Sequence, residues 1–168
     1  MKRVLFAAGA AAAVGVAVIA ATGASSAGGV AAVTSSISIR DRVGSQQTAD
    51  FLHKGKFHLL VNSTLFDSGG SSIRPLEGNS KTLGGQNQTP ISGTNTLTGK
   101  KGTLTITFQG LTVPVNVYPL ANPYSIEYGT WKVTGGTGSY KGWKGNGRWA
   151  DAATPAVDTI EWIGSVTH

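Results

Sequence analysis

Residues 102–108 read Gly-Thr-Leu-Thr-Ile-Thr-Phe, and they carry the clearest structural signal in the chain. Leu104, Ile106 and Phe108 alternate with threonines, so these three side chains share one face if the segment is extended. Such alternation is typical of a strand with one buried face in an antiparallel sheet. Weaker forms of the pattern recur downstream, at Val113, Val115 and Val117, and at Ile160, Trp162 and Val166.

Outward from this stretch, the chain reads as a series of short strands. No segment keeps apolar residues at the spacing of a helix, and runs rich in Thr, Val, Ile, Tyr and Trp are separated by Gly, Asn, Ser and Pro clusters. We expect an all-β protein that either closes into a barrel or stacks as a sandwich. The expected strands, eight in number, are Ser36–Arg42, Lys56–Phe66, Ile91–Leu97, Gly102–Phe108, Val113–Tyr118, Glu127–Thr134, Gly145–Asp151 and Thr159–Val166.

Two local features qualify this pattern. Pro114 has no backbone N–H to donate, which predicts a sheet edge or a bulge at that position. Leu76–Gln88 is the longest polar stretch, and we expect it to be a mobile surface loop, either a plain connection or a functional one.

The composition bounds the class of protein. The chain has 168 residues, of which 24 are Gly and 13% are charged, and its apolar share of 40% suffices for one core. The absence of Cys excludes disulfides, thiolate metal sites and Cys nucleophiles. The formal charge of +6 is spread along the chain and indicates ordinary solubility.

The first 27 residues have the three parts of a secretory signal peptide. A basic start, Met1-Lys2-Arg3, precedes an uncharged apolar run at residues 4–21, and Ser25-Ser26-Ala27 matches a cleavage rule. The alternative is a membrane anchor, but the run is mostly Ala and Gly, which insert weakly. We therefore expect secretion by the general pathway, a flexible tail at residues 28–36, a barrel domain at residues 37–168, and no stable membrane anchor after cleavage.

A glycine-rich segment, residues 129–150 (GTWKVTGGTGSYKGWKGNGRWA), predicts a sharp turn between strands. Tyr140 in this segment can fold back over a barrel end. The turn motif consists of Gly135, Gly136, Thr137, Gly138, Tyr140 and Gly142, followed by Gly145 and Gly147. It resembles the GGTG-x-[FY]-x-G-x-x-G-x-G signature of the dirigent and allene oxide cyclase barrel superfamily. Over residues 91–168 the chain is similar to small secreted bacterial members of that superfamily.

The resemblance implies a single eight-stranded antiparallel, calycin-like barrel whose interior can hold an apolar molecule. It also implies that self-association into dimers or trimers is compatible with the fold. The matching motif is a turn, so the resemblance assigns no catalytic residues to this chain.

Three residues are candidates for a pocket, namely Glu127, Trp131 and Arg74. Glu127 shares strand parity with Trp131, and a carboxyl inside an apolar barrel has a raised pKa and can exchange protons. Arg74, beside the long polar stretch, can receive an anionic group at a pocket mouth. The plainer interpretations are a Glu at a strand end facing water and an Arg on the surface. Asp67, before Ser-Gly-Gly, is interpreted as a turn residue.

Other chemistries find no support in the sequence. The glycine run lacks the spacing and the following helix of a phosphate or dinucleotide loop. His53 and His58 have opposite strand parity and no carboxylate cluster nearby, so we expect no metal site. No cofactor and no nucleic-acid partner are expected, because the basic residues are dispersed and the chain is exported.

Three functions follow as expectations. The first is a secreted barrel that binds a small hydrophobic molecule without catalysis. The second, implied by the resemblance, is a cofactor-free cyclase or isomerase, or a dirigent-type stereochemical guide acting on a small apolar substrate. The third is a barrel filled by its own side chains, with a structural or cell-surface interaction role.

Overall fold

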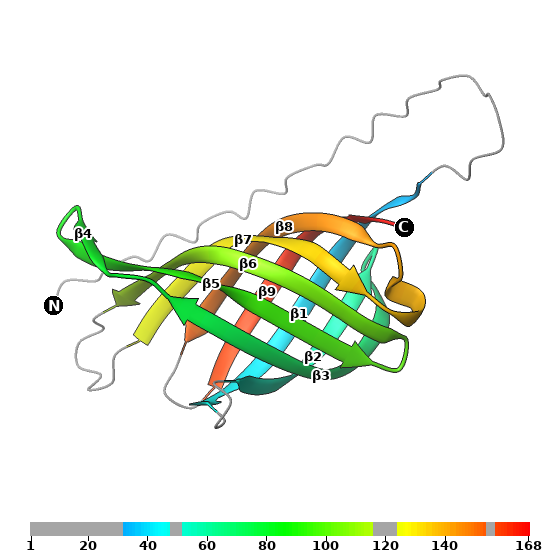
Figure 1. Ribbon diagram of the computed structural model, residues 1–168, viewed down its shortest axis with the longest axis horizontal. Coiled ribbons are helices and arrows are strands. Elements are labelled where there is room, and N and C mark those ends of the chain that lie inside the picture. Colours follow the sequence, from blue (N-terminus) through cyan, green and yellow to red (C-terminus); the bar gives the residue numbers. More distant parts are fainter. Residues whose placement is uncertain (1–31, 48–51, 116–123, 154–156) are drawn as a thin grey trace, which may run out of the picture. The chain divides into compact units, whose positions relative to one another are not determined.

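The computed structural model describes residues 32–47, 52–115, 124–153 and 157–168, and the predicted signal peptide lies outside them. The described segments are almost entirely β-strand, with one short 3₁₀ helix, η1 (Gly138–Tyr140) (Figure 1). The strands are β1 (Thr34–Gln47), β2 (His53–Val61), β3 (Thr64–Glu77), β4 (Lys81–Leu83), β5 (Gln86–Gly99), β6 (Gly102–Val115), β7 (Tyr124–Gly136), β8 (Lys144–Ala153) and β9 (Val157–Thr167).

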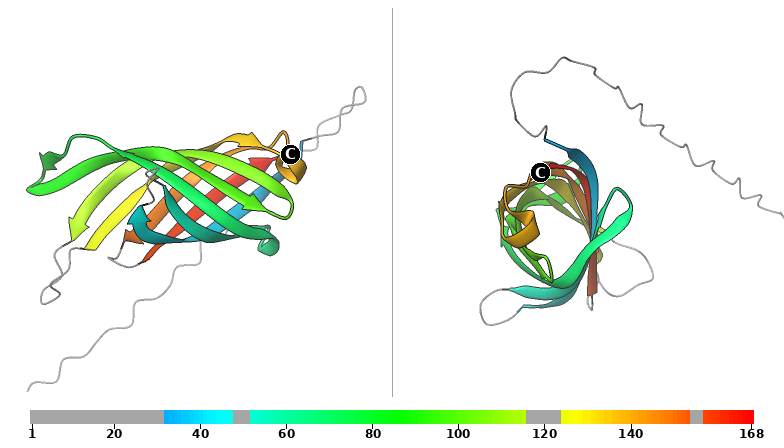
Figure 2. Two further views of the ribbon diagram at one scale, coloured as in Figure 1. Left: turned by 60° about the horizontal axis from the view of Figure 1, so that its bottom comes forward. Right: turned by 90° about the vertical axis from the view of Figure 1, so that its right-hand side faces the viewer.

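All strands except β4 form one closed antiparallel barrel. Neighbours pair in the order β3-β2-β1-β9-β8-β7-β6-β5, and β3 also pairs with β5, which joins the two edges of the sheet. Viewed from the end that carries η1, these strands form a ring (Figure 2). Closure pairs the two strands that would otherwise be exposed edges. The structure confirms the predicted eight-stranded antiparallel barrel and excludes the sandwich.

Strand boundaries differ from the prediction where the sequence carried weak turn signals. β1 begins at Thr34, inside the tail predicted for residues 28–36. The predicted strand Lys56–Phe66 is interrupted by a two-residue turn at Asn62 and Ser63, whose φ values are 48° and 65°. Positive φ at both positions is the type I′ hairpin geometry, which matches the twist of the flanking strands.

The predicted strand Gly102–Phe108 and the start of the predicted strand Val113–Tyr118 belong to a single strand, β6, which continues to Val115; residues 116–118 lie outside the described residues. Pairing of β6 with β5 ends at Thr112, so beyond that residue β6 is paired with β7 alone. Pro114 lies in this one-sided part, where a missing N–H costs little. The edge position predicted for Pro114 is therefore confirmed.

The polar stretch Leu76–Gln88 is not the mobile loop that its composition suggested. β3 extends to Glu77, and the short strand β4 pairs with Gln86–Gln88 at the start of β5. Gly84 and Gly85, with φ of 60° and 80°, form the two-residue turn between them. The stretch is thus a hairpin that projects beyond the barrel wall (Figure 1).

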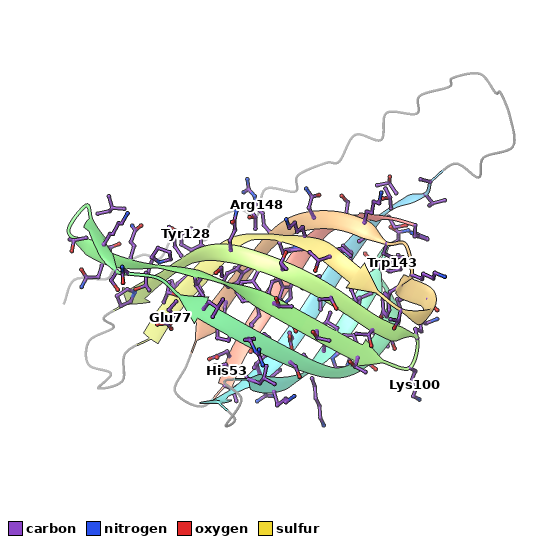
Figure 3. The ribbon with its side chains drawn as sticks, viewed as in Figure 1. His53, Glu77, Lys100, Tyr128, Trp143 and Arg148 are labelled. Atoms are coloured by element: carbon purple, nitrogen blue, oxygen red, sulfur yellow. The ribbon has the colours of Figure 1, made fainter. Side chains whose placement is uncertain are left out.

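One end of the barrel is closed by aromatic side chains around η1. Tyr140 is fully buried, and its ring packs edge-on against Phe66 and Trp143, at centroid distances of 5.8 and 5.0 Å. Trp143 and Lys100 mark this end in Figure 3. The prediction that Tyr140 folds back over a barrel end is confirmed.

Asp67 ties this closed end together and is not a turn residue, because it lies within β3 and is buried. Its carboxylate accepts hydrogen bonds from the Tyr140 hydroxyl at 2.8 Å and from the backbone N–H groups of Lys100 and Lys101 at 3.2 Å. Burial opposes ionisation of Asp67, but these bonds and one from Ser68 outweigh it and lower the pKa of the carboxyl. The Asp67 carboxylate therefore holds both the β5–β6 turn and η1 in place.

We expect Tyr140→Phe to lower the free energy of unfolding by about 2 kcal/mol at neutral pH, because it removes a donor from a buried carboxylate. Because the pKa of Asp67 is depressed, its ionised carboxylate stabilises the fold above the ordinary carboxyl pKa. This contribution is lost as pH falls through the pKa that Asp67 has in the folded protein. The loss should therefore shrink in acid. Urea denaturation at several pH values measures it, with Tyr128→Phe on the exposed outer wall as the control. Equal losses in both variants would contradict the assignment.

In the part of the chain that the structure describes, no helix is long and apolar enough to cross a bilayer.

Candidate functional site

A cavity of about 160 Å³ lies inside the barrel at the end opposite Tyr140. His53 and Glu77 belong to its lining and lie toward that end in Figure 3, away from Trp143 and Lys100. The volume is that of a cavity able to take one benzene-sized ring. The lining residues are apolar or aromatic (Val43, Ile73, Pro75, Ile91, Phe108, Trp149, Ile160 and Trp162) or titratable (His53, Glu77, Glu127, Asp151 and Asp158).

The floor of the cavity is aromatic. Trp149 and Trp162 stack with centroids 5.5 Å apart, and Phe108 meets them edge-on at 5.2 and 5.5 Å. These distances and angles are those of favourable aromatic pairs. All three side chains are buried, so they form a rigid apolar base on which a ring can stack.

Glycines on the inner wall make room for the Trp149 ring. The indole lies across β7 toward β6, where its Nε1–H donates to the Gln109 carbonyl oxygen at 3.3 Å. A Cβ on Gly110 would lie 2.9 Å from Cζ2 of this ring. Gly110 pairs with Gly129 across β6 and β7, so the wall has no side chain beneath the ring at either position. The pair of glycines thus positions one side of the cavity floor.

Trp131 uses a second pair of glycines in the same way. Its Nε1–H donates to the Arg148 and Ile163 carbonyl oxygens, at 3.0 and 3.2 Å. A Cβ on Gly164, which pairs with Gly147, would lie 2.8 Å from Cζ2 of Trp131. Trp131 is therefore a buried wall residue, with its polar atom satisfied by backbone.

Two carboxyl groups lie side by side on neighbouring strands of the cavity lining. Glu127 on β7 and Asp151 on β8 are directly paired across the strands, and both line the cavity. Like charges in such a pair repel. Burial, reinforced by the charges of Asp158 and Glu127, raises the pKa of Asp151 to about 7, although backbone N–H groups oppose the shift. At neutral pH part of the Asp151 population therefore carries a proton on this carboxyl.

The pKa of Glu127 is also raised, first by burial and then by the charges of Asp158 and Glu77. A hydrogen bond from the Thr112 hydroxyl, 3.0 Å long, and the nearby His53 oppose this rise. The cavity therefore combines two carboxyls whose ionisation is disfavoured. Groups of this kind can accept a proton, donate one or bind a cation.

Two buried polar atoms of the cavity lining have no hydrogen-bond partner among the described residues. They are Oδ1 of Asp151 and Nε1 of Trp162, in side chains that are 6% and 0% exposed. Buried polar atoms without partners cost stability and are rare in native proteins. Trp131 and Trp149, in contrast to Trp162, donate their indole N–H to backbone carbonyl oxygens.

A second polar cluster lies deeper in the barrel. Asp41 accepts hydrogen bonds from Ser71 Oγ at 2.6 Å and from Asn95 Nδ2 at 2.9 Å, and all three residues are buried. Burial raises the pKa of Asp41, although the two bonds oppose the shift. The three residues join β1, β3 and β5 across the interior and do not line the cavity. They are a structural cluster.

The residues predicted from sequence fall in three places. Glu127 lines the cavity, whereas Trp131 lies in the wall and does not line it. Arg74 is exposed on β3, between Ile73 and Pro75, whose side chains line the cavity. The motif residues Gly135, Gly136, Thr137, Gly138, Tyr140 and Gly142 lie at the opposite, closed end.

Sequence reasoning missed Asp151, Asp158 and Trp162. The available signal was the spacing of Asp151, which lies two residues after Trp149, so that in a strand both side chains point to the same inner face. Nothing local indicates that it faces Glu127. Within the described ranges, no group of three His, Cys, Asp or Glu is arranged to hold a metal ion.

Shallow depressions also follow the outer wall, for example over Gly110, Leu111 and Tyr128. They are open to solvent and have no buried polar group of their own, so the interior cavity is the better candidate site. The fold and this site define the class of protein: a closed antiparallel barrel, with one end sealed by aromatic residues and a carboxyl-lined cavity at the other.

Neither family models, nor curated proteins, nor solved structures gave a match to this chain.

Proposed function

We propose that the protein is a small binding barrel that holds one small, largely hydrophobic molecule in the cavity above Trp149 and Trp162. The observation that carries the proposal is the cavity itself, with an aromatic floor and a few polar groups in its lining. Pockets for small molecules combine an apolar lining with a few polar groups that fix orientation.

We further propose that the barrel belongs with the dirigent and allene oxide cyclase barrels and works outside the cell. The glycine turn ending in Tyr140 and the closed antiparallel topology support the first part. The signal-peptide pattern of residues 1–27 supports the second. Self-association through the outer wall, where Leu76, Ile126 and Tyr128 are exposed, is a corollary of the resemblance.

Catalysis is the second candidate function, and Asp151 favours it. A carboxyl with a pKa of about 7 inside an apolar cavity can protonate or deprotonate a bound molecule at neutral pH. Glu127, paired with Asp151 across the strands, can take the opposite role. This arrangement suits a cofactor-free isomerase or cyclase. A filled barrel with a structural role is the alternative if nothing enters the cavity.

The test is an NMR titration of the four indole N–H signals of the intact chain with benzyl alcohol, a neutral single-ring probe. We expect the signals of Trp149 and Trp162 to shift, because these rings form the cavity floor. The signal of Trp143, at the sealed end, should remain unchanged. Native mass spectrometry of the protein recovered from culture medium, with solvent extraction, would then identify a natural ligand and report the oligomeric state.

A filling variant supplies the control. Ile160→Phe enlarges a side chain of the cavity lining and should abolish the shifts, whereas Ile163→Phe, on the exposed face of β9, should leave them intact. If no probe moves Trp149 or Trp162, or if Ile160→Phe binds as well as the unchanged protein, the binding proposal fails.

A further inference from the structure

Acidic residues are concentrated at the cavity although the protein is basic. Of the eight Asp and Glu residues in the chain, Glu77, Glu127, Asp151 and Asp158 all line it. The described lining contains no Lys or Arg, and His53 is its one basic side chain. A cavity lined by one sign of charge, with low-dielectric walls, attracts the opposite charge.

The unpartnered atoms point to a ligand independently of the charges. Oδ1 of Asp151 is a buried acceptor without a donor, beside a floor that offers only ring faces and the free N–H of Trp162. A ligand that donates a hydrogen bond to Asp151 would satisfy the acceptor and relieve its repulsion with Glu127. A ligand ring would stack on the aromatic floor.

We propose that the cavity selects a small organic cation: a protonated amine attached to a single ring or a body of similar size, with the ammonium group against Asp151 and Glu127 and the ring over Trp149 and Trp162. This inference rests on the proposed binding function and names its ligand class. Ring faces add to the recognition, because their negative quadrupole attracts a cation. Benzylamine has the required size and charge.

Binding of the amine should strengthen as pH rises. The groups that face Asp151 are Glu127 on β7, Asp158 on β9, Glu77 on β3 and His53 on β2. Between about pH 5 and about pH 8 Asp151 loses its proton, while the amine stays protonated. This change favours a cation in the cavity.

The experiment compares benzylamine, benzyl alcohol and benzoate on the intact chain, again through the indole signals of Trp149 and Trp162. At about pH 8 we expect benzylamine to bind at least about tenfold more tightly than benzyl alcohol, and benzoate to bind more weakly than either. The preference should fall as the pH is lowered to about 5.

Matched variants separate a local effect from overall charge. Asp151→Asn combined with Glu127→Gln should bring the affinities for benzylamine and benzyl alcohol to within about twofold of each other. Glu161→Gln removes an acid from the outer wall, where Glu161 pairs with Arg40, and should preserve the preference.

The outcomes distinguish the preference for a cation from the proposed small-molecule binding on which it rests. If benzyl alcohol binds as tightly as benzylamine at high pH, the cavity binds small molecules but is not selective for cations. If benzoate binds best, the inferred charge of the ligand is wrong. If none of the three probes moves Trp149 or Trp162, the binding function itself is overturned, and the cation preference with it.

Discussion

Asp151→Asn should make the protein more stable at about pH 8, by up to about 4 kcal/mol in the free energy of unfolding. In the folded state burial, Asp158 and Glu127 raise the pKa of Asp151 to about 7, well above its value in an unfolded chain. The native state therefore binds this proton more tightly than the unfolded chain does. The stabilisation that the bound proton gives the fold is fully present below the unfolded pKa and is lost as pH rises from about 4 to about 7. An amide avoids that cost, because it carries no charge.

The gain should disappear at about pH 4, where Asp151 is protonated in the native state. Urea denaturation, monitored by tryptophan fluorescence at the two pH values, measures both the gain at high pH and its disappearance at low pH. Glu161→Gln is the control, since its exposed ion pair with Arg40 is worth less than about 1 kcal/mol at either pH. A variant Asp151→Asn that is less stable at high pH would mean that the carboxylate is satisfied in the native protein, which would also weaken the case for a ligand.

Gly129→Ala should destabilise the barrel by about 3 kcal/mol, an unusually large effect for the addition of one methyl group. A Cβ at this position would collide with the Gln109 carbonyl oxygen and would lie 2.6 Å from Cα of Gly110. β7 is paired on both sides, with β6 and with β8, so the backbone has little freedom to move away. The substitution should also displace Trp149, whose ring lies over Gly110.

Gly135→Ala in the same strand is the matched control. There a Cβ would lie 3.6 Å from the Thr105 side chain, an ordinary contact, so we expect a change within about 0.5 kcal/mol. Thermal and urea denaturation of the two variants test the difference. Similar stability of both would show that the wall at Gly129 can spread, and that the close approach of β6 and β7 is not required.

Much of the fold was predictable because its signals are local. The alternation of Leu104, Ile106 and Phe108 places these residues on the inner face of β6, where all three are buried. Tyr140 closes the barrel end, as the turn motif indicated. The type I′ turn at Asn62 and Ser63 was missed, since this pair is a weaker hairpin signal than Asn-Gly.

The candidate site was predictable only in part. Parity alone put Glu127 on the inner face, and it does line the cavity. The same parity holds for Trp131, yet its ring lies along the wall over Gly164, because an inward residue can be either lining or packing. Arg74 alternates with Ile73 and Pro75 and is exposed. The role of Asp151 became visible only from the pairing of β7 with β8, which places it beside Glu127.

The sequence by itself determined most of the strands, the alternation of their two faces and the glycine-rich turn, because a period of two residues and the conformational freedom of Gly act over short distances along the chain. Tertiary structure decided the rest. Closure of β3 onto β5 turned inner faces into one enclosed volume, and strand register set Glu127 opposite Asp151 and left Asp151 Oδ1 and Trp162 Nε1 without partners. Cavity shape and carboxyl pKa depend on which distant residues meet, and register and closure bring those residues together.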